Sequence, residues 1–221
     1  MTTTMIEGTT VEQVTALLVP VDVLRELATA AVAAGTDNTL PNLTGVRLEW
    51  SDEGIDAVAT DRWRLANVYW DGKHRGWADN MLTGTPEGSA LLPAKELTAY
   101  VKSLPKPSKR GTPALVAIRP EGDGVRFTCD TGEGEVSRMI PTLDGEFPKW
   151  RSLLPTEWGA VEAIAMDPRF LADVAKMPTP RHAPVRVRFT MPTRPMVWSG
   201  EGECVKWQYL LMPIRQAPTY S

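Results

Sequence analysis

The chain has 221 residues, 43% of them hydrophobic, which is enough for one large or two small domains with their own cores. It carries 24 Lys and Arg against 27 Asp and Glu, and this net charge of -3 excludes a protein that binds nucleic acid through a uniformly basic surface. Cys129 and Cys204 lie far apart without Cys-x-x-Cys spacing, which excludes a disulfide framework and favours two buried thiols in a reducing compartment.

The sequence shows no signal for export or membrane insertion. Residues 1–10, MTTTMIEGTT, contain neither the basic nor the apolar part of a secretory signal, so we expect a cytoplasmic protein. The most apolar helical stretch, VLRELATAAVAAG, is too short to span a bilayer and is interrupted by Arg25 and Glu26. We therefore expect no membrane partner.

The first predicted unit begins with an apolar strand that ends at Pro20. Proline suits the first turn of a helix, where the missing N–H is not needed. Apolar residues at helical spacing follow, and Gly35 marks the end of this helix. Three predicted strands complete the unit, over residues 43–50, 55–60 and 64–70.

Two further units repeat this pattern around Pro93 and Pro168. The leading strand of the third unit is predicted over residues 163–166. Pro105 and Pro178 mark the ends of the second and third helices. The strands after these helices are predicted over residues 113–119, 124–129, 134–140, 184–190, 195–199 and 203–211.

The units begin about every 73 residues, so the chain holds about three of them and an α+β fold is predicted. Leu24, Leu97 and Leu171 occupy equivalent helix positions and are predicted to face the core. Residues 1–145 are predicted to form a domain of two units, and residues 146–221 a linker and a shortened domain of about one unit. Units of this kind must pair to close a core, so an odd number predicts a homo-oligomer.

The sequence contains little that suggests catalysis. His74 and His182 are the only histidines, and neither has a metal-binding spacing, so both are expected to be solvent-exposed or loop residues. No P-loop, G-x-S-x-G or H-E-x-x-H motif is present. We therefore expect a protein that is not an enzyme and has no catalytic residues, metal or cofactor.

Basic residues gather on and near the predicted helices, although acidic residues on the same helices dilute the pattern. The exposed side of the helices that carries these basic residues either contacts DNA phosphates or is only in contact with solvent. The candidate DNA-facing residues are Arg25, Lys95, Lys102, Lys106, Lys109, Arg110, Arg169 and Lys176.

Residues 39–70, TLPNLTGVRLEWSDEGIDAVATDRWRLANVYW, resemble the middle domain of the bacterial beta sliding clamp, the processivity subunit of replicative DNA polymerase. Two further segments agree in order. LDGEFPKWRSLLP resembles the linker between the second and third domains of that family, and YLLMPIR resembles its carboxy-terminal strand. No segment of this sequence resembles the family's first domain, and after Pro155 we find one unit where the family has two.

This resemblance implies a clamp fold with helices lining a ring around duplex DNA and sheets outside, without sequence readout. Three units per chain fit a tetramer, whereas an undetected fourth unit would give a trimer. The implied partners are double-stranded DNA, further copies of the chain, and the replicative polymerase and clamp loader, which bind through short peptides. The alternative is a clamp-like interaction protein, a decoy or a transcription adaptor, that keeps the peptide groove without encircling DNA.

The resemblance also implies an apolar peptide groove near the end of the chain. Two departures from the family pattern bear on its specificity: Arg62 and Trp63 stand where Gly-His is usual, and Ser152 replaces an arginine of the linker motif. The competing interpretation is that YLLMPIR forms only a buried edge strand. The implied groove residues are Leu43, Thr60, Arg62, Trp63, Arg64, Leu65, Pro148, Leu153, Leu210, Met212, Pro213 and Ile214.

Overall fold

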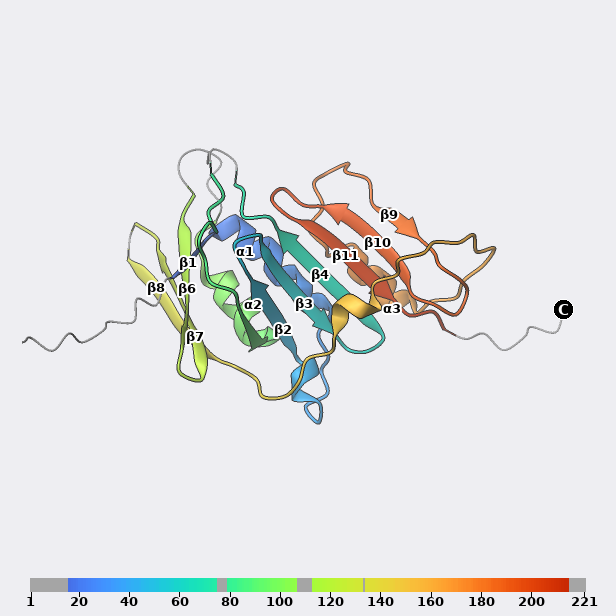
Figure 1. The fold of residues 1–221 in the computed structure, drawn as a ribbon, viewed down its shortest axis with the longest axis horizontal. Helices are drawn as coiled ribbons and strands as arrows, with labels where there is room; N and C mark the ends of the chain where they lie inside the picture. Colours follow the sequence, from blue (N-terminus) through green and yellow to red (C-terminus); the bar gives the residue numbers. More distant parts are fainter. Residues whose placement is uncertain (1–15, 75–78, 107–112, 133, 215–221) are drawn as a thin grey trace, which may run out of the picture.

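A computed structural model describes residues 16–74, 79–106, 113–132 and 134–214, which form two antiparallel sheets with helices packed against them (Figure 1). The smaller sheet has the order β1 (Leu17–Pro20), β6 (Leu115–Glu121), β7 (Gly124–Asp130) and β8 (Glu135–Pro141). The larger has the order β5 (Gly88–Pro93), β2 (Gly45–Trp50), β3 (Ile55–Thr60), β4 (Arg64–Trp70), β11 (Lys206–Leu211), β10 (Met196–Glu201) and β9 (Arg186–Arg188). The predicted α+β class is confirmed.

The first two units are interlocked because each gives its leading strand to the other. Strand β1 pairs with β6 of the second unit, with Val19 opposite Val116. Strand β5 pairs with β2 of the first unit, with Val46 opposite Leu92. The expectation that units must pair is therefore confirmed for these two.

Helices α1 (Val21–Leu27) and α2 (Ala94–Ser103) supply the core of this pair, and α1 continues into the 3-10 helix η1 (Ala28–Ala33). Leu24 and Leu97 are fully buried, as their equivalent positions predict. Tyr100 of α2 packs against Phe127 of β7, with ring centroids 5.3 Å apart and ring planes tilted by 47°. A full aliphatic or aromatic side chain buried in this way contributes about 1.5–3 kcal/mol.

The third unit differs from its prediction in two respects. Residues 163–166 form no strand, although Ala165 accepts a backbone hydrogen bond of 2.9 Å from Ile214. Helix α3 (Pro168–Val174) leaves Leu171 40% exposed, so the prediction that this leucine faces the core is wrong. The physical reason is the missing partner: within the described chain, no further unit covers this helix or supplies a strand.

The segment after β8 crosses the face of the larger sheet that is turned away from the helices, and it contains the short helix η3 (Trp150–Leu153) (Figure 1). Leu65 of β4 lies opposite Leu210 of β11 on this outer face. Phe147 and Trp150 pack against these two leucines and are 6% and 5% exposed. The predicted boundary between residues 145 and 146 thus falls within this crossing segment.

Among the described residues, no helix has the length and apolar character needed to cross a membrane.

Candidate functional site

A groove of about 630 Å³ lies on the outer face where β4 meets β11. Leu65 and Leu210 form its floor and are almost completely buried. Leu153 and Met212 border it and are 49% and 37% exposed. An apolar floor with partly exposed apolar walls suits a ligand that inserts apolar side chains.

One wall of the groove is the turn that joins β3 to β4. The Asp61 carboxylate accepts hydrogen bonds of 3.0 Å from the backbone N–H groups of Trp63 and Arg64. Arg62 has a φ of 79°, a left-handed conformation that glycine adopts without strain. Trp63 is 63% exposed at the rim, and its carbonyl accepts a bond of 2.8 Å from the N–H of Met212. The turn and the end of β11 are thereby held together.

The opposite wall is the crossing segment, which Arg151 attaches to the sheet. Its guanidinium pairs with Glu49, and at 2.7 Å with Asp56, and stacks over the Trp150 ring at 4.3 Å. Burial raises the pKa of Asp56 despite this pairing. Burial acts in the same direction on Glu49, but hydrogen bonds from Arg151 and Arg47 outweigh it and lower the pKa of Glu49. Arg151 thus contacts two acids whose pKa values are shifted in opposite directions.

Most of the predicted groove residues come together in this hollow. Leu43 is buried in the short helix η2 (Pro41–Leu43) and does not line it. Pro213 and Ile214 follow Met212 along the chain but are also not among the lining residues. The predicted residues that do line the groove are Thr60, Arg62, Trp63, Arg64, Leu65, Pro148, Leu153, Leu210 and Met212.

Four lining residues were missed as groove candidates. Ser152 lies in the crossing segment, and the other three are Thr193, Arg194 and Pro195, in the turn before β10. The turn meets the groove because β10 pairs with β11, which places Met196 opposite Leu211. Nothing in the Thr-Arg-Pro sequence of this turn indicates that it lines a groove. Only the pairing of the strands places it there.

Arg64 connects the groove to the helix side of the sheet. Its guanidinium pairs with Asp61 at 3.0 Å and also with Asp173 of α3. Lys176 adds a bond of 2.6 Å to Asp173, which is 5% exposed. The centroid of the Phe170 ring lies 4.6 Å from the guanidinium carbon of Arg64. This cluster fixes α3 against β4 and positions one groove residue.

The candidate DNA-facing residues differ in how freely they could reach a phosphate. Lys95, Lys102 and Lys106 are exposed on and after α2 and form no salt bridge with other described residues. Arg169 and Lys176 are exposed too, but they pair with the neighbouring acids Asp167 and Asp173. Their net contribution to a positive surface is therefore smaller.

Arg25 does not behave as a surface cation. Its guanidinium donates bonds of 2.6 and 3.1 Å to the carbonyls of Leu104 and Pro105, at the end of α2. This contact caps α2 and joins the two helices, so the expectation that Arg25 faces DNA is not supported by its geometry. Lys109 and Arg110 lie outside the described residues.

Comparison with known proteins agrees with this architecture. The family model of the DNA polymerase III beta subunit, central domain, matches residues 18–149. The chain belongs to the beta sliding clamp family. This match covers both interlocked units and the start of the crossing segment, including the turn that forms one groove wall.

Relatives and solved structures extend the similarity. The beta sliding clamp of Streptomyces coelicolor is 33% identical over 165 residues, which are 72% of this chain and 39% of that protein. The beta sliding clamp homolog GriR of Streptomyces muensis is 32% identical over 142 residues, which are 62% of this chain and 34% of that protein. The Streptococcus pyogenes polymerase beta subunit has the same fold, with a TM-score of 0.74 at 17% identity, covering 96% of this chain and 68% of that one. The chain thus spans less than half the length of these two sequence relatives.

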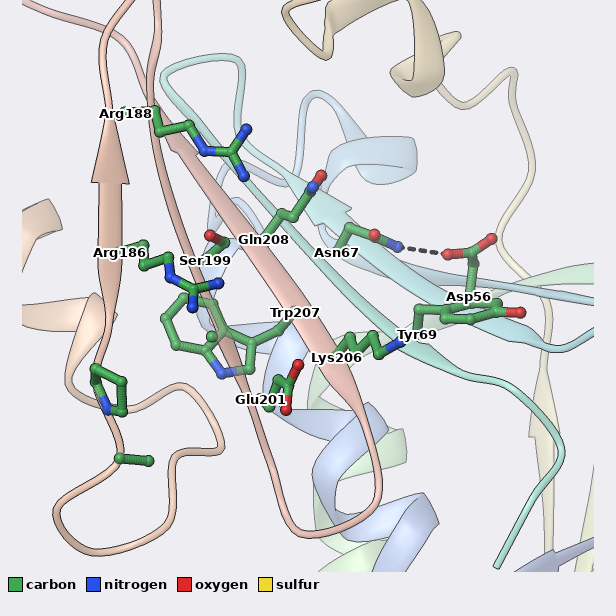
Figure 2. Close-up of a pocket in the computed structure, with 13 residues that line it drawn as sticks. Asp56, Asn67, Tyr69, Arg186, Arg188, Ser199, Glu201, Lys206, Trp207 and Gln208 are labelled. Carbon is green, nitrogen blue, oxygen red and sulfur yellow. Dashed lines mark hydrogen bonds between the residues drawn. The ribbon is translucent and has the colours of Figure 1, made fainter.

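A second hollow on the same outer face, of about 500 Å³, differs in character from the groove (Figure 2). Arg186 and Arg188 of β9 and Lys206 of β11 line it together with Glu201 and Asp56, whose carboxylate accepts a bond of 2.7 Å from Asn67. The sequence did not single out these residues. The charged side chains of this hollow are of both signs, whereas those that line the groove, Arg62, Arg64 and Arg194, are all cationic.

Proposed function

We propose that this chain is a sliding clamp subunit that binds short apolar peptides of a replicative polymerase and a clamp loader in the groove at the β4–β11 junction. The observation that carries this proposal is the groove itself, with Leu65 and Leu210 as floor and Leu153, Met212 and Trp63 at its border. Peptide side chains inserted there would each bury area contributing about 1.5–3 kcal/mol, before ordering costs. Micromolar affinity, about -8 kcal/mol, is then expected.

Truncating Leu153 and Met212 together to Ala should weaken peptide binding by about 30- to 100-fold, since the exposed walls lose most of their apolar area. Stability should change little because both side chains are partly exposed. The measurement is fluorescence anisotropy of a labelled hexapeptide with adjacent large apolar residues.

Ile214→Ala is the matched control for this double variant. Ile214 is also apolar and 51% exposed, but it does not line the groove. Equal losses of affinity in the control and the double variant would show that the peptide binds elsewhere. Quenching of Trp63, checked against Trp63→Phe, provides a second readout at the rim.

We further propose that copies of this chain close into a ring around duplex DNA, with the α2 surface facing the phosphates. Exposed apolar side chains concentrate in the third unit, at Leu171, Val185, Val187 and Met191, where a second copy would cover them. The edge strand β9 is exposed along its whole length. A ring would have a solution mass of three or four times 24.3 kDa.

Reversing Lys102 and Lys106 to Glu should reduce retention on circular duplex DNA and flatten its salt dependence. Removing one cation that neutralises a phosphate lowers the slope of log affinity against log salt by about 0.9. Retention is measured by gel filtration of the loaded complex over a range of salt, and mass by light scattering. An unchanged slope with an intact ring would show that this helix face is only solvated, and a monomer would favour the alternative that never encircles DNA.

A further inference from the structure

Three side chains of metal-ligating type meet at the opposite end of the β4–β11 junction from the groove. Asp22 lies in the first turn of α1, His74 follows β4, and Cys204 lies in the turn between β10 and β11. One ligand atom from each lies within 4.8 Å of the others. His74 lies in a loop, as one of the two expected alternatives for this histidine has it, but its side chain is only 7% exposed. Cys204 is only partly buried.

Two distances in this cluster are close to the edge lengths of a zinc tetrahedron. His74 Nε2 is 3.0 Å from Asp22 Oδ2, and Cys204 Sγ is 3.8 Å from the same oxygen. Zinc bonds of about 2.1 Å to N or O and 2.3 Å to S place tetrahedral ligands about 3.4–3.6 Å apart. These two separations bracket the tetrahedral values, and the third pair, His74 Nε2 and Cys204 Sγ, lies within 4.8 Å, so side-chain rearrangement would allow all three atoms to contact one ion.

Neighbouring groups hold two of the three ligands in place. The Glu26 carboxylate accepts hydrogen bonds of 2.9 Å from the backbone N–H groups of Glu203 and Cys204, which fixes the turn carrying the thiol. Asp22 Oδ1 accepts a bond of 3.0 Å from the N–H of Val23. Support of this kind orients metal ligands in proteins. Cys204 also lines a surface hollow of about 180 Å³, through which an ion could enter.

We propose that Asp22, His74 and Cys204 bind a zinc ion, or a divalent transition ion of similar preference, with a fourth position left for water. A thiolate, an imidazole and a carboxylate favour zinc over calcium or magnesium, which prefer oxygen ligands. The carboxylate and thiolate together balance the charge of the ion. Because the ligands come from α1, from the chain after β4 and from the third unit, the ion would attach the third unit to the first.

Metal binding requires proton release in this cluster. In the structure His74 Nε2 is hydrogen-bonded to Asp22, and the Cys204 thiol points at the same carboxylate. The ion needs the thiolate and an unprotonated Nε2, so it replaces protons at the positions these hydrogen bonds occupy.

The test uses the full-length, untagged, reduced protein after chelator treatment, titrated with Co²⁺ and then with Zn²⁺. Co²⁺ should give tetrahedral visible bands and a sulfur-to-cobalt charge-transfer band at one ion per chain, and Zn²⁺ should displace it. Cys204→Ser should abolish the charge-transfer band, and His74→Asn and Asp22→Asn should each weaken binding at least tenfold. Zn²⁺ should also raise the thermal unfolding midpoint of the unmodified chain.

The chain supplies matched controls, because it contains one other cysteine and one other histidine. Cys129 is buried in β7, and His182 is exposed in a turn. Cys129→Ala and His182→Asn should bind Co²⁺ as the unmodified chain does. The proposal is overturned if no thiolate band appears at saturating Co²⁺, or if binding persists in folded Cys204→Ser and Asp22→Asn proteins.

Discussion

Replacing Asp173 by Ala should lower the free energy of unfolding by about 3–5 kcal/mol, because it leaves the Arg64 guanidinium without one of its two acidic partners in a buried setting. The Arg64 side chain is 14% exposed and that of Asp173 is 7% exposed. Native proteins are stable by only about 5–15 kcal/mol, so a loss of this size is readily measured. The measurement is urea unfolding followed by tryptophan fluorescence.

Asp173→Asn should cost less than Asp173→Ala, since its single amide oxygen can still accept a hydrogen bond from Arg64 or from Lys176, which bond to different carboxylate oxygens of Asp173. Glu121→Ala provides a control with an exposed ion pair, to Arg126, and should change stability by about 0–1 kcal/mol. The Asp173→Ala protein should also bind groove peptides more weakly, because Arg64 lines the groove. A stability loss no larger than that of Glu121→Ala would contradict the assignment of a buried, structurally important pair.

Replacing Trp150 by Ala should cost about 3–5 kcal/mol and detach the crossing segment from the sheet. Trp150 is 5% exposed and packs with Phe147 on Leu65 and Leu210. Its indole N–H has no hydrogen-bond partner among the described residues, so its contribution is apolar packing. The groove would lose the wall that carries Pro148 and Leu153, and peptide binding should fall below detection. Hydrogen exchange of residues 143–154 should accelerate in this variant.

Arg151→Ala separates the packing of the segment from its ion pairs. The Arg151 side chain is 60% exposed, so its loss should cost only about 0–1 kcal/mol. The pKa of Glu49 is lowered in the folded state, so ionised Glu49 stabilises the fold at neutral pH. This stabilisation is lost as the pH falls below about 4.5, the ordinary pKa of a glutamate. The variant should therefore lose less stability on acidification than the unmodified chain. If Trp150→Ala and Arg151→Ala behaved alike, the segment would be held by charge and not by packing.

The local elements were largely predictable because they depend on short-range patterns. The strands over 55–60 and 64–70 agree with β3 and β4 residue for residue. Apolar spacing correctly placed Leu24 and Leu97 in the core. The same pattern failed at Leu171, since helical spacing identifies an apolar face but does not supply the element that covers it.

The sequence by itself determined the repeated unit, which rests on a regular spacing, and the resemblance to the clamp family, which rests on contiguous motifs. Most of the residues that line the groove were implied by that resemblance. Tertiary structure alone decided the rest. It exchanged the leading strands of two units, brought the 193–195 turn to the groove and used Arg25 as a helix cap. It also brought Asp22, His74 and Cys204 together, at sequence separations no motif spans. These outcomes depend on pairing between distant strands, and a chain's local preferences do not encode which distant partner lies beside them.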